Sequence, residues 1–178
     1  VQLNSANGYH LPEKKEITKK ISPKTKAILF TNPNNPTGTV FTPQEIQTII
    51  DIAREYNLFV IADETYRGMT FDNKESKSIL HLAKKEDLPN IIIGDSLSKR
   101  LNVCGARIGV VVSKNQEFIN AAFRFIQGRP YPSYIEQQIV APILNNCLEY
   151  IANLSQKYQK RRDAFISSLE QNLDIKIH

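Results

Sequence analysis

The chain has 178 residues, of which 41% are hydrophobic and 23% are charged, a composition typical of a globular protein with one real core. Its formal net charge is +5, but basic and acidic residues are mixed along most of the sequence. We interpret the one basic cluster, at 157–162, as a solvated helix face and expect no nucleic-acid partner. No apolar stretch is long enough to cross a bilayer, and two cysteines are too few for a disulfide framework. We therefore expect a cytoplasmic protein without a membrane partner.

The first 38 residues predict one strand and a rigid loop. Residues 1–25 have little periodicity and are expected to form an irregular lead-in with a short polar helix at 13–16. The apolar run at 26–31 is typical of a buried parallel strand. It is followed by 32–38, where two prolines and a glycine indicate a rigid loop.

A helix and a second strand come next. Thr42, Pro43 and Glu45 combine an N-cap, a proline at the first helical position and the glutamate of a capping box. Apolar residues then recur at helical spacing, which predicts a helix over 43–57, and the run at 58–62 predicts another buried strand. Because the order is strand, helix, strand, the two strands are expected to be parallel and joined by a right-handed crossover.

The middle of the chain predicts two more strands. The polar segment 67–89 contains one short predicted helix at 78–85. The apolar run at 91–94 predicts a third strand, and the run at 108–113 predicts a fourth. Strands that alternate with helices in this way indicate an α/β fold.

The rest of the chain is predicted to be mainly helical. A helix is expected over 116–127 and a linker over 128–133. The long helical pattern at 134–173 is expected to break near Pro142, because proline removes a backbone hydrogen bond. Residues 174–177 alternate like the beginning of a strand.

Polar residues follow the predicted strands at the points where these strands end, namely Asn35, Asp63, Ser96 and Lys99. In open α/β sheets ligands bind beyond the carboxyl ends of the parallel strands, so we expect these residues on one edge. Arg107 lies at the beginning of the fourth strand and joins them only if that strand is antiparallel to the others. We therefore predict a mixed, mostly parallel sheet.

The chemistry of these groups matches one ligand. Asp63 follows a buried strand and calls for a cationic or hydrogen-bonding partner, and Tyr66 can present its hydroxyl to the same ligand. Ser96 and Arg107 suit a phosphate dianion. Lys99 is an amine that, when partly desolvated, can attack a carbonyl. Pyridoxal 5′-phosphate (PLP) has the ring nitrogen, phenolic oxygen, aldehyde and phosphate that these groups require.

Each residue also has a simpler explanation when it is taken alone. Asp63 could be a strand-end cap, Tyr66 a packed aromatic and Asn35 a turn residue. We expect Ser98 to make local hydrogen bonds and Cys104 to be a small buried filler rather than a reactive thiol. No role is assigned to the three histidines, His10, His81 and His178.

Three blocks of the sequence resemble the signature of fold-type I aminotransferases of class I/II. They are Asn-Asn-Pro-Thr-Gly at 34–38, Ala-Asp-Glu-Thr-Tyr at 62–66, and 95–109 with Ser-Leu-Ser-Lys and Gly-Ala-Arg-Ile-Gly. Their order and separations fit as well, so the resemblance covers 8–178, and the last block is most similar to the aspartate aminotransferase branch. The resemblance implies a three-layer α/β/α fold with a mostly parallel mixed sheet, followed by a long connector helix.

The resemblance also implies a role for each site residue. Lys99 would form the internal aldimine with PLP and move a proton between substrate and cofactor. Asp63 would pair with the ring nitrogen, while Tyr66 and Asn35 would contact the phenolic oxygen. Asn35 is in addition implied as a substrate contact. The phosphate would be held by Ser96 and Arg107, and Ser98 is implied as a further cofactor contact. No metal site is expected.

The resemblance implies a domain organisation in which this chain is one part of a longer protein. Residues 1–133 would be a partial PLP-binding large domain, and 134–178 a helical connector toward a small domain. Because the chain begins at Val1, we expect a piece whose glycine-rich phosphate turn and ring-stacking aromatic precede it. The small domain would carry the arginine that binds the substrate carboxylate. In the family a neighbouring subunit completes the site, so a homodimer is implied.

The implied reaction moves an amino group between an amino acid, of aspartate type, and a 2-oxo acid. As an isolated piece the chain is expected to be poorly active or inactive. Two alternatives stay open. One is a non-catalytic aminotransferase-like module for ligand sensing or dimerisation. The other keeps PLP and changes the reaction, to that of a carbon–sulfur lyase or a related synthase.

Overall fold

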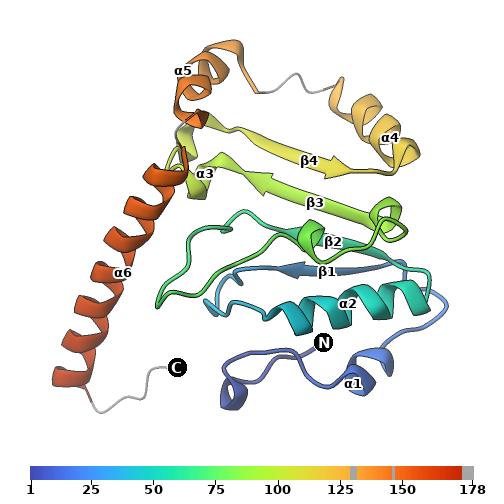
Figure 1. Cartoon of the computed structure of the whole chain (residues 1–178), viewed down its shortest axis with the longest axis horizontal. Coiled ribbons are helices and arrows are strands. Elements are labelled where there is room, and N and C mark those ends of the chain that lie inside the picture. Colours follow the sequence, from blue (N-terminus) through green and yellow to red (C-terminus); the bar gives the residue numbers. More distant parts are fainter. Residues whose placement is uncertain (129–131, 146, 174–178) are drawn as a thin grey trace.

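The fold is built on a four-stranded mixed sheet. The computed structural model describes residues 1–128, 132–145 and 147–173. The strands are β1 (Ala27–Thr31), β2 (Phe59–Asp63), β3 (Ile91–Ser96) and β4 (Gly109–Ser113), and they lie in the order β1-β2-β3-β4 (Figure 1). The first three are parallel and β4 is antiparallel to β3. The predicted α/β class and mixed, mostly parallel sheet are confirmed.

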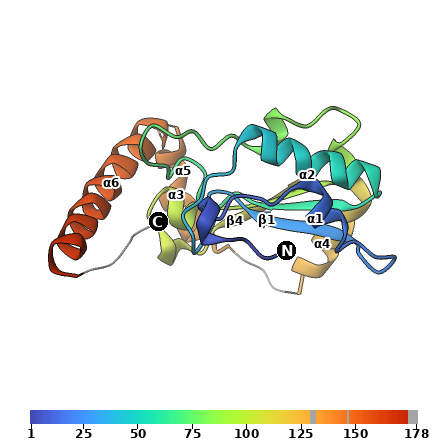
Figure 2. The same cartoon turned by 90° about the horizontal axis from the view of Figure 1, so that it is seen from below.

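Helix α2 (Pro43–Glu55) covers one face of the sheet (Figure 2). Thr42 caps it, and both hydrogen bonds of the predicted capping box with Glu45 are present. The isoleucines at helical spacing, among them Ile46 and Ile50, are buried against strand residues such as Val60. Val60 lies on the face of β2 that points toward α2, because successive residues of a strand point to opposite faces. This packing forms the main core.

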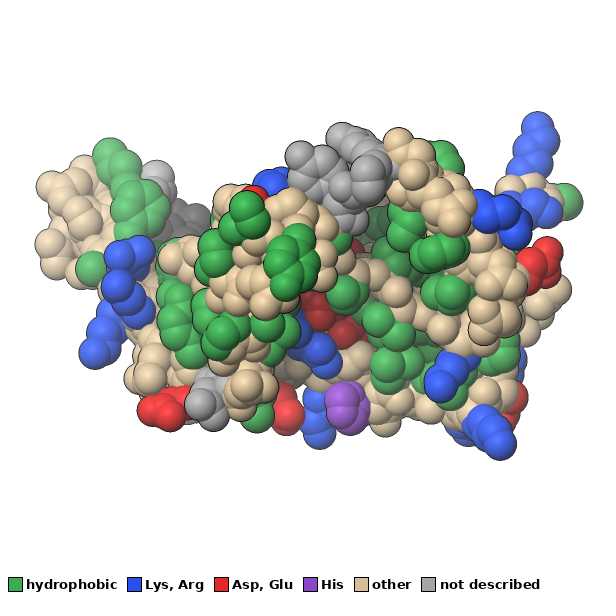
Figure 3. All heavy atoms as spheres, turned by 90° about the horizontal axis from the view of Figure 1, so that it is seen from above, with side chains coloured by type: hydrophobic (Ala, Val, Ile, Leu, Met, Phe, Trp, Pro, Cys, Tyr) green, Lys and Arg blue, Asp and Glu red, His purple; other side chains and the backbone are tan. Residues whose placement is uncertain are grey.

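The opposite face of the sheet carries exposed apolar side chains. Leu29 is 69% exposed and Val111 is 55% exposed, and both belong to the face that points away from α2. Seen from the β4 side, apolar side chains also gather over β4, α4 and α5 (Figure 3). The face of the sheet that points away from α2 is the one on which a further layer of the three-layer fold would pack.

The remaining helices are short except for one. They are α1 (Lys14–Thr18), α3 (Leu97–Arg100), α4 (Gln116–Ile126), α5 (Tyr134–Leu144) and the long α6 (Cys147–Asn172). None of the helices in the described part of the chain is long and apolar enough to cross a membrane. Among the described residues, four 3₁₀ turns complete the elements, at Ser5–Asn7, Ile79–His81, Leu88–Asn90 and Cys104–Ala106.

Two of the predicted elements differ in extent. The helix predicted over 78–85 is only a single 3₁₀ turn at Ile79–His81. Asp87 Oδ2 accepts a hydrogen bond from the backbone NH of Lys84 at 2.9 Å, and this bond holds the segment after the turn in a different conformation. The break predicted near Pro142 comes later, since α5 continues through the proline to Leu144. The strand predicted at 174–177 lies outside the described residues.

Helix α6 rests against the end of the sheet body through its first turns. Ile151 is buried with Leu101 and Val140 in a second apolar cluster. At Gly68 the chain passes α6 so closely that an added Cβ would lie 2.9 Å from Ile151 Cγ2, and its φ of +85° also favours glycine. This close approach fixes where the loop after β2 runs.

Candidate active site

The carboxyl ends of β1, β2 and β3 and the beginning of β4 meet at one edge of the sheet. The register sets Asp63 opposite Gly94 and Ser96 opposite Gly109. Because β4 is antiparallel, Arg107 lies just before its first residue, on the same edge, with a left-handed φ of +53°. The sequence required an antiparallel fourth strand for Arg107 to join the other groups, and β4 is antiparallel.

Asn35 and Tyr66 come together above this edge. Asn35 Nδ2 donates a hydrogen bond to the Tyr66 hydroxyl at 3.2 Å. Both residues line an open cleft of about 710 Å³ between the Asn-Pro loop, the loop after β2 and α6. The Asn-Pro loop is held from below by Asn32, which is buried and accepts the backbone NH of Phe41 at 2.9 Å.

Asp63 is half-buried at the end of β2. Its Oδ1 accepts the backbone NH of Thr65 at 3.0 Å, which is the bond expected of a strand-end cap. Within the described ranges, Oδ2 of Asp63 has no hydrogen-bond or ion-pair partner and is open to a ligand.

Lys99 lies on α3, a helix of one turn that Ser96 caps. Its side chain is exposed, and Nζ lies 3.9 Å from the Cys104 sulfur. Cys104 is exposed as well and donates to the Ser98 carbonyl at 3.1 Å. The prediction of a buried filler at Cys104 is wrong, because the turn at Cys104–Ala106 turns this side chain toward α3 instead of the core.

The hydroxyl groups of Ser96 and Ser98 are 3.0 Å apart. Ser96 Oγ also accepts the backbone NH of Ser98 at 3.1 Å and lies 3.2 Å from the carbonyl oxygen of Ile108. The expected local hydrogen bonding of Ser98 is therefore present. The same bonds tie the beginning of α3 to the segment that leads into β4.

Arg107 is exposed and donates from Nη1 to the Cys104 carbonyl at 3.1 Å. Across residues 1–128, 132–145 and 147–173, neither Arg107 nor Lys99 has a carboxylate within ion-pair distance. An amine and a guanidinium without acidic partners, beside a half-buried carboxylate, fit a ligand that carries an aldehyde, an anionic group and a cationic ring nitrogen. PLP has these groups, so the residues present fit it.

Sequence reasoning missed a charged cluster beneath this edge. Asp95, Arg100, Arg67 and Glu64 form ion pairs with one another. Asp95 and Arg100 stand inside the third signature block, but the pairing of Asp95 with Arg67 depends on how the loop after β2 is placed against β3. No local sequence pattern could have indicated it.

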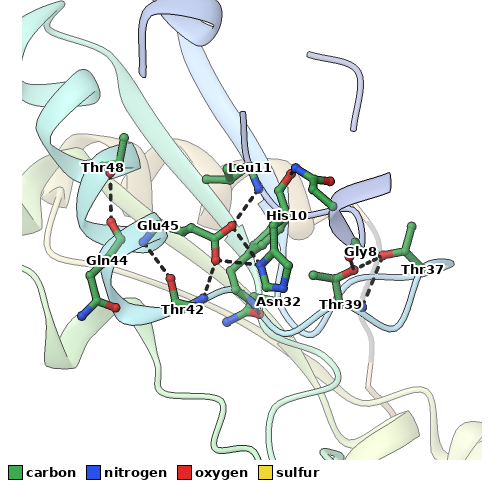
Figure 4. Close-up of polar contacts among 12 residues, drawn as sticks. Gly8, His10, Leu11, Asn32, Thr37, Thr39, Thr42, Gln44, Glu45 and Thr48 are labelled. Atoms are coloured by element: carbon green, nitrogen blue, oxygen red, sulfur yellow. Dashed lines mark hydrogen bonds and ion pairs between the residues drawn. The ribbon is translucent and has the colours of Figure 1, made fainter. Parts of the chain in front are cut away.

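His10, to which no role was assigned, ties the beginning of the chain to α2 (Figure 4). Its Nδ1 lies 2.9 Å from Glu45 Oε2, and Glu45 also accepts the backbone NH groups of Leu11 and Thr42, each at 2.7 Å. Burial raises the pKa of Glu45, but these hydrogen bonds outweigh it, and the net pKa lies below its ordinary value. His10 therefore has a structural contact, and it also lines the cleft that contains Asn35 and Tyr66.

No cluster of three or more histidine, cysteine, aspartate or glutamate side chains in the described part of the chain is arranged to hold a metal ion. The groups at the edge are an amine, a carboxylate, a phenol, hydroxyls and a guanidinium. Their chemistry is that of an organic, phosphorylated ligand.

Comparisons with known proteins place the chain in a family. The profile of the family described as aminotransferase class I and II matches residues 1–177. The chain is 29% identical over 178 residues to 1-aminocyclopropane-1-carboxylate synthase 11 of Arabidopsis thaliana, covering 94% of this chain and 38% of that protein. It is 42% identical over 121 residues to the glutamate-pyruvate aminotransferase AlaA of Escherichia coli K12, covering 63% of this chain and 29% of that protein.

The fold is shared with solved structures. A double mutant of the aspartate aminotransferase of Thermus thermophilus superposes with a TM-score of 0.84 at 23% identity, covering 96% of this chain and 44% of that one. The chain thus spans less than half the length of these relatives. Members of the matching family use PLP. The chain belongs to the aminotransferase class I and II family.

Proposed function

We propose that this chain supplies the central, cofactor-binding part of a PLP-dependent aminotransferase, in which Lys99 bonds covalently to the cofactor. The substrates would be an amino acid, of aspartate type, and a 2-oxo acid. The observation that carries the proposal is the set of Lys99, Asp63 and Arg107 at one sheet edge, with both cations free of carboxylate partners among the described residues.

Bound PLP would supply an electron sink for the carbanion that forms when the amino acid loses its α-proton. The Lys99 amine would carry that proton, since its side chain is exposed at the edge. The open oxygen of Asp63 would hold a proton on the ring nitrogen by charge pairing. The Tyr66 hydroxyl, already bonded to Asn35, would donate to the phenolic oxygen.

The phosphate would be bound by Arg107 together with the hydroxyls of Ser96 and Ser98. Arg107 has one bond, to the Cys104 carbonyl, and keeps donors for a phosphate. Because the hydroxyl oxygens of Ser96 and Ser98 are 3.0 Å apart, they can bind neighbouring oxygens of one phosphate. Asn35, exposed in the cleft, would also contact the substrate.

The organisation of the whole protein belongs to the same proposal. Residues 1–133 would form part of the PLP-binding domain, and 134–178 would connect it to a smaller domain. A homodimer would complete the site. We also propose the cytoplasm as its location, because Cys104 and Cys147 are both free thiols.

A second candidate keeps the cofactor and changes the reaction to that of a synthase or lyase. Four 1-aminocyclopropane-1-carboxylate synthases of Arabidopsis thaliana are 29% to 35% identical to this chain over the matched residues, which is the observation that favours it. An aminotransferase needs a 2-oxo acid to complete each turnover. A lyase or synthase ends each turnover with the cofactor again in its aldehyde form, so it needs no 2-oxo acid. Turnover that depends on added 2-oxo acid would favour the aminotransferase, and a sensing module would bind PLP without turnover.

The proposal is tested by reduction with borohydride of the full-length protein mixed with PLP, followed by peptide mapping. We expect a reduced adduct on Lys99 and its loss in Lys99→Ala. Lys114→Ala is the matched control, since Lys114 is also exposed but follows β4 at the opposite edge of the sheet. An adduct that persists on another lysine in Lys99→Ala would contradict the assignment.

A further inference from the structure

Two arginines beside the proposed active site converge on one carboxylate. Arg67 directly follows Tyr66, and Arg100 directly follows Lys99. Arg100 Nη2 pairs with Asp95 Oδ2, and Arg67 Nη2 lies 3.6 Å from the same oxygen. Two segments that carry proposed catalytic residues are thus joined at a single side chain.

Asp95 is well placed to hold both segments because it belongs to β3, near the centre of the sheet. Its side chain is 11% exposed, and its Oδ1 accepts the backbone NH of Ser96 at 2.7 Å. Both carboxylate oxygens are therefore occupied, one by the beginning of α3 and one by the two arginines.

The cluster is closed on its other side by Glu64. Arg67 Nε lies 3.5 Å from Glu64 Oε2, and Glu64 Oε1 accepts the backbone NH of Ile79 at 2.8 Å. The side chain of Glu64 is buried. Two guanidinium groups and two carboxylates thus balance in charge, and removal of one would leave a poorly solvated charge without its partner.

Neither segment is held rigidly by its own secondary structure. Helix α3 has four residues, and one helical turn is not stable by itself. Tyr66 lies in the loop that follows β2. Catalysis by positioned groups is sensitive to displacements of about 1 Å, so something outside these segments must fix their relative placement.

We propose that Asp95 is a positioning residue that sets the placement of Lys99 relative to Tyr66, through Arg100 and Arg67 respectively. The inference rests on the proposed function. It adds a residue that touches neither cofactor nor substrate, and it assigns a purpose to an ion cluster that the binding of PLP alone does not require.

The variant that tests it is Asp95→Asn in the full-length protein. Asparagine has the same shape and can still accept the Ser96 NH, but it loses the charge that attracts both arginines. The main readout is the pH titration of the absorbance of PLP bound to Lys99. When the Tyr66 donor moves away from the phenolic oxygen, the bound cofactor holds its proton to higher pH.

We expect the titration midpoint to rise by about 0.5 pH unit or more in Asp95→Asn. We also expect kcat to fall by about tenfold, with a smaller change in KM, because the displacement affects the reacting groups more than binding. Arg67→Gln, which removes one of the two ties at a more exposed side chain, should shift the midpoint in the same direction by less. It also provides the test if Asp95→Asn does not fold.

The matched control is Asp87→Asn. Asp87 is another shielded aspartate that two bonds of 2.9 Å tie to an arginine, Arg54, but this pair lies away from the site edge. It should lower thermal stability and leave the titration midpoint and kcat unchanged. An unchanged midpoint and kcat in folded Asp95→Asn would overturn the proposal, and so would an equal shift in Asp87→Asn.

The outcome separates this inference from the proposed function. Borohydride reduction of the same preparations reports whether Lys99 bonds to PLP at all. A wild-type adduct on Lys99, together with a normal titration in Asp95→Asn, refutes only the positioning role. The absence of a wild-type adduct refutes both.

Discussion

Asp63 is the residue for which the structural and the catalytic explanation differ most clearly. Its Oδ1 accepts the Thr65 NH, as a strand-end cap would, while its other oxygen is open. Asp63→Asn keeps an acceptor for Thr65 and removes the charge. We expect turnover to fall by about 100-fold or more, with a melting temperature close to that of the wild type, because a preorganised charge at the ring nitrogen is lost. Steady-state kinetics and a melting curve check this.

The half-buried Asp51 on α2 provides the control, since Asp51→Asn changes the same charge far from the site edge. Normal turnover in Asp63→Asn would show that Asp63 is only a cap. A loss of folding in that variant would likewise argue for a structural role.

At this scale, the sequence could place the site residues but not their contacts. Asn35, Asp63, Ser96 and Lys99 lie at one edge because parallel strands end together, a rule that needs only the order of elements. The exposure of Cys104 could not be predicted, because it depends on the direction of one 3₁₀ turn.

Among the elements, α2 is the one whose local sequence and tertiary packing agree most fully. Thr42 Oγ1 accepts a hydrogen bond from the backbone NH of Glu45 at 3.2 Å, and Glu45 Oε2 accepts one from the backbone NH of Thr42 at 2.7 Å. Thr42→Ala should lower the free energy of unfolding by about 1 kcal/mol, because one NH at the helix start loses its acceptor. Thr48→Ala, in the same helix, is the control, since the Thr48 hydroxyl only bonds back to the Gln44 carbonyl. Equal effects in chemical denaturation would argue against the cap.

Prediction of the elements failed where distant side chains intervene. The apolar spacing at 43–57 leads to α2 because the helix buries that same face. At 78–85 a helical pattern is also present, yet only Ile79–His81 forms a turn. Asp87 Oδ2 accepts the NH of Lys84, so this NH is not available for a helical hydrogen bond to the carbonyl of Leu80. Glu64 Oε1 accepts the NH of Ile79, which fixes the first residue of the turn from another part of the chain.

The tie between α2 and Asp87 predicts a dependence of stability on pH. Hydrogen bonds from Arg54 hold the pKa of Asp87 below its ordinary value of 3.8. Because the folded pKa lies below the unfolded one, this contribution is complete above about pH 4 and is lost as the pH falls through the folded pKa. Melting temperatures between pH 2 and pH 6 should therefore fall less steeply on acidification in Asp87→Asn than in the wild type. Parallel curves would contradict this.

For the molecule as a whole, the notable feature is the clamp between α6 and the loop after β2, which begins at the proposed site. Arg162 donates to both oxygens of Asp72 at 2.7 Å and lies over the Phe71 ring, 4.9 Å from its centroid. Gln159 Oε1 accepts the Asp72 NH at 3.0 Å. These contacts join residues 87 to 91 positions apart, which is why no local pattern predicts them.

The two halves of α6 are held to the rest of the molecule by different contacts. Its first turns are held by the buried Ile151 and Leu154, whereas the exposed second half depends on the clamp. We expect Asp72→Ala to speed hydrogen exchange of amides in 156–172 and to leave 147–154 and the melting temperature nearly unchanged, because exposed ion pairs add little to global stability. In 1 M salt the wild type should approach the variant, since screening weakens the pair. Asp163→Ala is the control, because Asp163 also pairs with Arg162 but lies on α6 itself. Equal protection in both variants would mean that the long helix, and any domain that it connects, is independent of the loop that carries Tyr66.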